Sequence, residues 1–493
     1  MPEPRAWQFT AGSAALGLVL ATAAVAASGP WDGGQRTAER AHAAAASPGV
    51  TRLAPAPAPA AAPPRPAKPA PAPSAPGVLR ALPAPDTAAV PPAGPATRPA
   101  TPPATRPADL AATLVPLLAD PGLGSLRTAS VVDTATGAQL FGEGAGTPMT
   151  PASTVKIATV AAALSALGPD HRIPTTVTAT PDGRTVTLVG GGDPTLDPAR
   201  LKALAGDTAR ALRKRGHTSV RLAYDTHLYG GPALHPIGPN ENLAPVTALM
   251  TDEGRLDGSH SGPAPRTADP AGDTATAFAG LLKAAGIKLT GAPAPAPKAP
   301  PKAAAPAKDA PLARTYSAPL ADLAERTLTH SDNDLAEALA RQTALARKQP
   351  ASFDGAGKAV RDELAGLGLP LAGARFADGS GLDRRDRVSA ALLTGLLTRA
   401  ADPARPALRP VLTGLPVGGF TGTLAGRFDT APAGAGLVRA KTGTLTGVNT
   451  LAGTVVTADG RLLAFAFLAG QTLSPYEAQP ALDRLSAALT GRA

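Results

Sequence analysis

Three short groups of polar residues, spread along the chain in a fixed order, carry the side chains that acyl transfer requires. A serine hydroxyl is a poor nucleophile at its own pKa, and a nearby amine held partly neutral by burial and by a second cation can take its proton. The groups are Ser153-Thr154-Val155-Lys156, Ser331-Asp332-Asn333 and Lys441-Thr442-Gly443. One such group alone occurs by chance in a chain of this length, but the three together predict a serine acyl-transfer site.

The first group lies in an apolar run, 150-TPASTVKIATVAAAL-164, that predicts a buried helix. Thr150 and Pro151 favour a helix start just before the group. Ser153 and Lys156 then lie on one face, one turn apart. A buried lysine is costly as a cation, which suits a general base. The alternative is that Ser153 caps the helix and Lys156 extends to solvent.

The other two groups supply the remaining chemistry. Lys441, on a strand facing the helix, would provide the second positive charge and attract a substrate carboxylate. Ser331 would relay a proton between a lysine and the leaving amine. Asn333 would orient the amide next to the scissile acyl group.

An acyl-transfer site also needs two backbone N–H groups for the developing oxyanion. Ser153, at a helix start, offers one, and Thr444 offers the other. Gly443 allows a substrate backbone to lie against the strand edge, beside Thr442.

The elements that must position these groups can be predicted from periodicity and turn signals. A hairpin at 128–142 precedes the buried helix, and two helices in 319–347 are broken at 330–333. Three strands and a last helix follow at 436–443, 451–457, 462–470 and 477–490. Between the first two groups we expect strands at 184–191 and 218–225 and helices at 198–216 and 273–286. This order predicts an α+β fold whose main sheet draws strands from both ends of the chain.

Composition excludes several classes of protein. The chain has 493 residues, a formal charge of +10 and 3% aromatic residues. No compact basic patch with stacking residues is present, so nucleic acid is not a predicted partner. Cysteine is absent, which excludes disulfides, thiol catalysis and cysteine-ligated metal. The seven histidines lack metal-ligand spacing, and we expect no metal and no cofactor.

The N-terminal segments predict export and a spacer. Residues 1–27 are predicted to be a signal peptide or, alternatively, an uncleaved membrane anchor. Residues 28–108 are Ala/Pro-rich, and their composition predicts a disordered spacer. We expect a main domain from 109–175 and 312–493, with an inserted smaller α/β domain at 176–290 and a Pro/Ala/Lys linker at 291–311.

Several longer blocks resemble the D-alanyl-D-alanine carboxypeptidase/endopeptidase family, the class C low-molecular-mass penicillin-binding proteins of peptidase family S13. They are 223-AYDTHLYGGPALHP-236, 243-LAPVTALMTDEGR-255, 331-SDNDLAEALAR-341, 376-FADGSGLDRRDRVS-389 and 441-KTGTLTGVNTLAG-453. The resemblance runs from about Asp109 to Ala493. It implies a penicillin-binding-protein/serine β-lactamase-like transpeptidase fold, with an antiparallel sheet flanked by helices and an all-helical part. Many members carry a further small domain where this chain has only Leu256–Thr267.

The resemblance implies a serine-type D-Ala-D-Ala carboxypeptidase that acts on peptidoglycan stem peptides through an acyl-enzyme at Ser153. Cleavage of the terminal bond and of the cross-link both stay open. β-Lactams would be covalent inhibitors, and the enzyme would work outside the cell, at the wall or the outer face of the membrane. The alternatives are a serine β-lactamase and a catalytically idle protein that binds wall peptides or penicillin.

Three further features of the sequence have a functional and a structural interpretation. Glu337 and Arg341 are four positions apart on one helix and predict a structural ion pair. The glycine-rich loop 378–382 either lines the site or forms a tight turn. Arg384, with Leu445 and Thr446, is a weaker candidate for contacting a side chain of the stem peptide.

Overall fold

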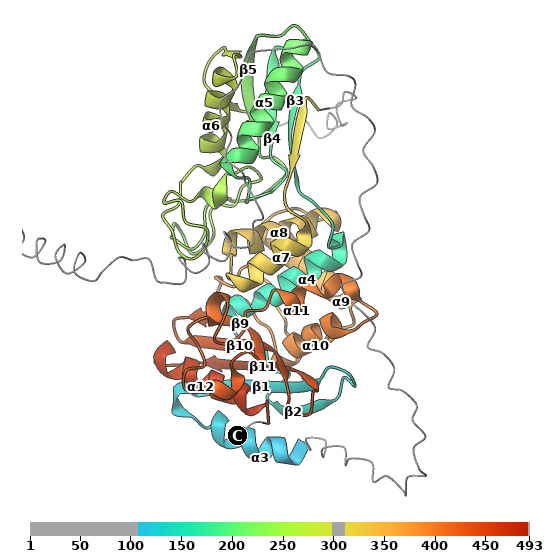
Figure 1. Cartoon of the computed structure of the whole chain (residues 1–493), viewed down its shortest axis with the longest axis vertical. Helices are drawn as coiled ribbons and strands as arrows, with labels where there is room; N and C mark the ends of the chain where they lie inside the picture. The colour runs from blue at the N-terminus through green and yellow to red at the C-terminus, as the bar shows by residue number, and fades with distance from the viewer. Residues whose placement is uncertain (1–106, 298–310, 492–493) are drawn as a thin grey trace, which may run out of the picture. The chain divides into compact units, whose positions relative to one another are not determined.

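The computed structural model describes residues 107–297 and 311–491 (Figure 1). The predicted signal or anchor segment, nearly all of the predicted spacer and residues 298–310 of the predicted linker lie outside the described residues. In the two described stretches, no helix has both the length and the apolar character needed to cross a membrane.

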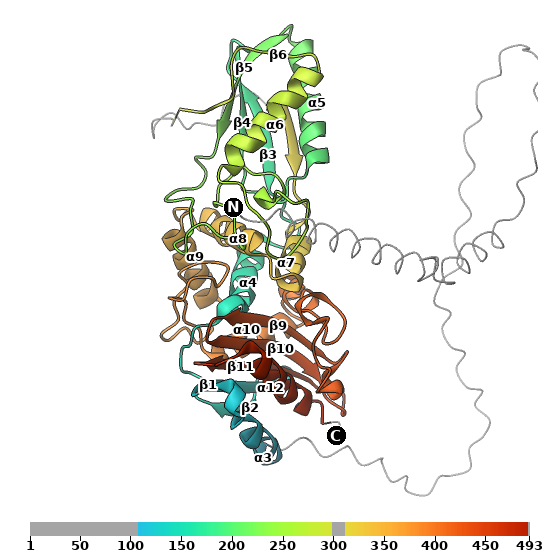
Figure 2. The same ribbon diagram turned by 90° about the vertical axis from the view of Figure 1, so that its left-hand side faces the viewer.

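An antiparallel five-stranded sheet joins the two ends of the described chain (Figures 1 and 2). Its order is β2-β1-β11-β10-β9, so β1 pairs with β11 along its full length, from Leu126 opposite Gly470 to Asp133 opposite Leu463. The predicted sheet with strands from both chain ends is thereby confirmed. The strands are β1 (Leu126–Asp133), β2 (Gln139–Glu143), β9 (Val438–Leu445), β10 (Val448–Val456) and β11 (Leu462–Gly470).

The two faces of this sheet pack against different helices, because side chains alternate along each strand. On β11, Phe465 and Phe467 face a core shared with α3 (Pro107–Leu118) and α12 (Pro475–Ala488). The smaller alternate residues of β11, such as Ala464 and Ala466, face the other core, which includes α10 (Ala390–Ala401).

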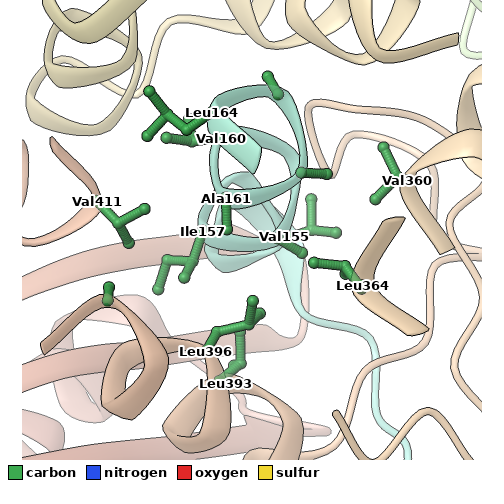
Figure 3. Packing of buried hydrophobic residues seen from close by; sticks show 14 of the residues in the cluster. Val155, Ile157, Val160, Ala161, Leu164, Val360, Leu364, Leu393, Leu396 and Val411 are labelled. Atoms are coloured by element: carbon green, nitrogen blue, oxygen red, sulfur yellow. The ribbon is translucent and has the colours of Figure 1, made fainter. Parts of the chain in front are cut away.

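Helix α4 (Lys156–Leu167) runs through the centre of that second core and is apolar on nearly every side. Figure 3 shows its side chains enclosed by residues of α9, α10 and α11, among them Val360, Leu364, Leu393, Leu396 and Val411. Each fully buried side chain of this size contributes roughly 1.5–3 kcal/mol to stability. The remaining helices of this part are α7 (Leu320–Thr329), α8 (Asn333–Ala346), α9 (Phe353–Gly366) and α11 (Pro410–Thr413).

The predicted cap of this helix at Thr150 is wrong. The chain enters through a short 3-10 helix, Ala152–Val155, which no side chain caps, and Ala152 has a positive φ of 48°. The Thr150 hydroxyl instead accepts a hydrogen bond from Arg387 Nη1 at 2.9 Å. A tertiary contact has replaced the local cap.

A second, mixed sheet lies between the first two motifs in sequence. Its order is β6-β5-β4-β3-β8, with β7 also paired to β5, and α5 and α6 pack on it through one shared core. The strands predicted at 184–191 and 218–225 are confirmed as β4 and β5, and the helices predicted at 198–216 and 273–286 as α5 and α6. The elements are β3 (Pro174–Ala179), β4 (Thr185–Val189), α5 (Pro198–Lys214), β5 (Ser219–Asp225), α6 (Pro270–Ala284), β6 (Lys288–Leu289), β7 (Ala294–Pro295) and β8 (Ala313–Tyr316).

The second sheet extends a few residues beyond three of the predicted domain boundaries. β8 pairs with β3 in the second sheet, although residues from 312 onward were assigned to the main domain. β3 starts at Pro174, inside the segment 109–175, and β7 pairs with β5 inside the predicted linker. Backbone hydrogen bonds between short strands determine where the second sheet ends. Such pairing cannot be predicted from amino-acid composition, because it depends on the neighbouring strand. The division into domains otherwise stays a prediction.

Candidate active site

The three motifs meet at one cleft of about 400 Å³. Ser153 comes from the 3-10 helix before α4, Ser331 from the turn between α7 and α8, Asn333 from the first position of α8, and Thr442 and Thr444 from β9. Its other lining residues are Asn242, Arg255, Ser261, Gly262, Pro263, Arg266, His330, Asp332, Leu382 and Thr423.

Lys156 is completely buried at the base of the cleft and makes three hydrogen bonds. Its Nζ donates to Ser153 Oγ at 3.0 Å, to Asn333 Oδ1 at 2.7 Å and to the carbonyl of Ser380 at 2.6 Å. The snorkelling alternative is therefore wrong, because the ammonium points into the protein and toward the serine. The amine is within direct proton-transfer distance of the hydroxyl.

Burial lowers the pKa of Lys156 from its usual value to about 8. Desolvation penalises the cation, and the opposing attraction of nearby carboxylates, Asp378 first among them, recovers only part of the loss. A lysine with this pKa is neutral in a substantial fraction of molecules near pH 8. It can then accept a proton from Ser153.

Lys441 is the second completely buried lysine of the site. Its Nζ donates to the carbonyl of Thr442 at 2.8 Å. Burial, and then repulsion from Lys156, hold the pKa of Lys441 well below its usual range. A ligand carboxylate placed in the cleft would favour the charged form of this amine.

Position 443 requires a glycine because β9 passes very close to the start of the 3-10 helix. A Cβ at this position would lie 2.2 Å from Thr450 Oγ1, 2.7 Å from the carbonyl of Pro151 and 3.1 Å from the backbone nitrogen of Ser153. The neighbouring Thr450 hydroxyl, buried, donates to the Pro151 carbonyl at 2.8 Å and ties the strand to the helix entry.

Substitution of Gly443 by alanine is expected to slow acylation of Ser153 by about tenfold or more, because backbone atoms must shift beside the serine. The rate of labelling with a fluorescent penicillin measures this effect. Gly280, in α6, has open space at its Cβ position and no positive φ, and Gly280→Ala is the control for substitution at a glycine remote from the cleft. A wild-type rate for Gly443→Ala would contradict the close approach described here.

The turn that carries Ser331 has a strained backbone and a firm anchor. Ser331 has a φ of +59°, which non-glycine residues seldom adopt. Asp332 caps α8 by accepting from the backbone N–H of Leu335 at 3.0 Å. Asn333 donates from Nδ2 to the carbonyl of Asn242 at 3.0 Å while its Oδ1 accepts from Lys156.

A cluster of buried acids and arginines lies behind this turn. Glu253 pairs with Arg255 at 2.8 Å and with Arg326, and Asp334 pairs with Arg266 at 2.9 Å. Burial, then the charge of nearby Asp332, raises the pKa of Glu253 to about 9. The cluster joins residues 253–266 to the start of α8, so the Ser331 turn is held from the side of the second sheet.

The sequence left open whether the loop 378–382 lines the site or forms a tight turn, and it does both, because Leu382 lines the cleft. Glu337 Oε1 accepts from the backbone N–H groups of Gly379 and Ser380, each at 3.0 Å, and its Oε2 pairs with Arg341 at 3.0 Å. The predicted structural ion pair is therefore confirmed. What sequence reasoning missed is that Ser380 turns its carbonyl to Lys156. A main-chain acceptor has no side-chain signature, although the paired glycines of this loop were a signal.

Arg384 and Thr446 are also brought together. Arg384 Nη2 donates to the carbonyl of Thr446 at 2.5 Å, and both residues line a second hollow of about 380 Å³ beyond the end of β9. A contact of Arg384 with a side chain of the stem peptide stays a prediction.

Two groups of buried residues lie close enough together to be considered for a metal ion. They are His235 with Glu337 and Asp378, and Glu253 with Asp332 and Asp334. Each group is matched by arginines or backbone N–H donors in the described residues. We therefore assign neither group to a metal ion.

The fold and the site together define a protein of the penicillin-binding, active-site-serine class. Penicillin binding protein 4 from Haemophilus influenzae superposes with a TM-score of 0.63 at 23% identity, over 78% of this chain and 98% of that one. The predicted fold class, an antiparallel sheet flanked by helices with an all-helical part, is confirmed by this likeness.

Sequence comparison identifies the family. The model of the D-Ala-D-Ala carboxypeptidase 3 (S13) family matches residues 110–265 and 257–489. The carboxypeptidase DacB of Mycolicibacterium smegmatis is 37% identical over 77% of this chain and 83% of its own length. The D-alanyl-D-alanine carboxypeptidase of Actinomadura sp. strain R39 is 30% identical over 70% of this chain and 78% of its own length. The chain belongs to the S13 family, as its motifs predicted.

Proposed function

We propose that the chain is a serine-type D-Ala-D-Ala carboxypeptidase that acts on peptidoglycan stem peptides with Ser153 as nucleophile and Lys156 as general base. The observation that carries this proposal is the contact of 3.0 Å between Lys156 Nζ and Ser153 Oγ, with the pKa of Lys156 lowered to about 8. This contact and this lowered pKa support a base that reaches the nucleophile and is partly neutral at a mildly alkaline pH.

In the acylation step, Ser153 Oγ transfers its proton to neutral Lys156 and attacks the carbonyl carbon of the penultimate D-Ala. The negative charge that develops on the carbonyl oxygen is taken by the backbone N–H groups of Ser153 and Thr444. The C–N bond then breaks, and the proton passes from Lys156 to the leaving amine, relayed by Ser331. Free D-Ala departs, and the rest of the peptide remains as an ester on Ser153.

In the second step, water hydrolyses the ester. A water molecule loses a proton to neutral Lys156 as its oxygen attacks the ester carbon, and the proton returns to Ser153 Oγ as the C–O bond breaks. The products are the shortened peptide acid and the free serine. Asn333, held between Asn242 and Lys156, orients the substrate amide next to the scissile bond.

Lys441, with Thr442 and Gly443, is proposed to bind the terminal carboxylate. A carboxylate at this place would pair with an amine whose hydrogen bond goes to a backbone carbonyl and not to an acidic side chain of the described residues. Binding would then be coupled to proton uptake by Lys441.

Lys441→Ala is expected to raise KM for a D-Ala-D-Ala peptide and to lower kcat as well, because it removes both the carboxylate attraction and a positive field in the transition state. Steady-state D-Ala release measures both constants. Lys358→Ala, at an exposed lysine paired with Asp362 on α9, is the control. An unchanged KM for Lys441→Ala would place the carboxylate elsewhere.

β-Lactams are proposed to acylate Ser153 as mimics of the substrate. Penicillin binding protein 4 from H. influenzae has been solved in complex with a β-lactam, which supports the proposal by likeness of fold. The amide bond of the strained lactam ring would break in place of the peptide bond, and the amine would stay attached to the acyl group.

The test combines a labelled-penicillin gel with a D-Ala release assay on the purified protein. A long-lived adduct, abolished in Ser153→Ala, together with D-Ala release supports the carboxypeptidase. Rapid turnover of penicillin without D-Ala release would indicate a β-lactamase, and neither activity would indicate a binding protein. Products from cross-linked and uncross-linked muropeptides then decide between endopeptidase and carboxypeptidase action.

The place of action is proposed from the substrate and the N-terminal sequence. Peptidoglycan lies outside the cytoplasmic membrane, and family membership fits an exported enzyme that acts on the wall. Residues 1–27 would direct export, either as a cleaved signal peptide or as a retained anchor.

A further inference from the structure

Both acceptors that hold Lys156, other than Ser153 itself, are reached from residues 226–267, named here the insert loops. These loops follow β5 of the second sheet and precede α6. The first tether is Asn333, whose Nδ2 donates to the carbonyl of Asn242 at 3.0 Å and whose Oδ1 accepts from Lys156 at 2.7 Å. An amide group is planar, so fixing its NH₂ side also fixes the direction of its oxygen.

The second tether runs through His235 and Asp378. His235 Nε2 lies 2.9 Å from Asp378 Oδ2, and both side chains are almost completely buried. The other oxygen of Asp378 accepts from the backbone N–H of Gly381 at 2.6 Å. Between these two residues of the loop stands Ser380, whose carbonyl accepts from Lys156 at 2.6 Å. The histidine thus contacts the Asp378 carboxylate, which in turn accepts hydrogen bonds from the backbone of this loop.

The surroundings of His235 settle which ring nitrogen carries the proton. The backbone N–H of Ile237 donates to Nδ1 at 3.2 Å, so Nδ1 is the acceptor and Nε2 carries the hydrogen that goes to Asp378. Phe353 of α9 packs its ring edge to face against the imidazole, with centroids 5.2 Å apart. Removal of the imidazole would therefore take away the hydrogen bond that Asp378 Oδ2 accepts.

We propose that His235 is a positioning residue for acylation: through Asp378 it holds the Ser380 carbonyl that keeps Lys156 Nζ beside Ser153 Oγ. This inference rests on the proposed function. It gives the insert loops a task in the chemistry, although none of the groups in this chain of contacts touches the substrate from the loop side.

Arg255 and Arg266 of the insert loops line the cleft, whereas the charged groups with the largest effect around Lys156 come from β9, from the Ser331 turn, from α8 and from the segment 377–388. They are Lys441, Asp332, Glu337, Arg341, Asp378 and Asp386. Burial alone would raise the pKa of Asp378, but hydrogen bonds, that from His235 foremost, lower it to about 2 and keep the carboxylate charged. Without the histidine, the ammonium form of Lys156 loses a well-placed carbonyl acceptor and part of this stabilising charge. The pKa of Lys156 is then expected to fall.

The experiment measures the acylation rate by labelled penicillin as a function of pH for His235→Leu and His235→Gln. Leucine keeps the apolar packing on Phe353 but has no donor, and we expect a rate loss of about tenfold or more, with the acidic limb of the pH profile moved to lower pH. Glutamine can place its amide N–H near the position of Nε2, and we expect it to retain most of the rate. His227→Ala is the control, because His227 is in the same loops, has a half-exposed side chain and pairs with Asp225.

Asp378→Asn is the second variant, for the case in which His235→Leu does not fold. It keeps the shape of the carboxylate and removes its charge, so the acidic limb is expected to move in the same direction. A folded His235→Leu protein with the wild-type rate and limb would overturn the inference. The inference would also be overturned if His235→Leu lost rate without any shift of the acidic limb and His235→Gln did not recover that rate. A purely structural role of His235 would produce this result. If the wild-type protein itself is not acylated, the proposed function fails instead.

Discussion

Lys156→Ala is expected to abolish most of the acylation of Ser153 by penicillin, with a loss of about 10³-fold or more, because the serine loses the base that takes its proton. Rapid-quench labelling of the folded protein measures the loss. Ser153→Ala abolishes the adduct altogether. The two residues act as one unit, so in D-Ala release the double variant is expected to be hardly worse than either single variant.

The wild-type pH profile gives an independent check on the same lysine. Its pKa is lowered to about 8, and only the neutral amine accepts a proton, so acylation is expected to fall about tenfold per pH unit below that value. Lys156→Met, which keeps much of the side-chain volume, is the matched variant if alanine destabilises the buried helix. A folded Lys156 variant with a near wild-type rate would refute the proposed mechanism.

Glu337→Ala is expected to cost about 3–5 kcal/mol of the free energy of unfolding, because it leaves Arg341 buried without a carboxylate. Arg341 also stacks on Phe353 at 4.2 Å and cannot easily move to solvent. The backbone N–H groups of Gly379 and Ser380 lose their acceptor in the same variant. Urea denaturation followed by circular dichroism measures the change.

The control for this prediction is an ion pair of the same spacing on the neighbouring helix. Lys358 and Asp362 are also four positions apart, on α9, and their side chains are 59% and 38% exposed. Asp362→Ala is expected to change stability by less than about 1 kcal/mol, since water screens an exposed pair. Equal changes in the free energy of unfolding for the two substitutions would show that burial does not explain the contribution of the Glu337–Arg341 pair.

Much of the site could be predicted because its side chains follow one another at short spacings. The step of three from Ser153 to Lys156 placed both on one helical face, and the motif order placed Asn333 and β9 opposite them. The strands of the C-terminal meander were predictable from short apolar runs bounded by turn residues, and β11 is buried on both faces because a core lies on each side of it.

The parts that escaped prediction depend on tertiary contacts. The carbonyl of Ser380 and the imidazole of His235 reach the site across more than a hundred positions of sequence, and no local pattern reports such a meeting. The cap predicted at Thr150 failed for the same reason, because Arg387 takes the hydroxyl. Short strands such as β8 were missed because their pairing is decided by the backbone of the neighbouring strand.

The pairing of β1 with β11 also has a consequence for the order of events during synthesis. β1 lies between β2 and β11 in the sheet, so a nascent chain that has not yet produced Leu462–Gly470 lacks the strand that joins the two halves of the sheet. Contacts so distant in sequence slow folding, whereas the second sheet closes within residues 174–316. Strand β9, which passes beside Ser153, belongs to this late-synthesised part of the sheet, so the cleft is expected to be complete only after β1 and β11 have paired.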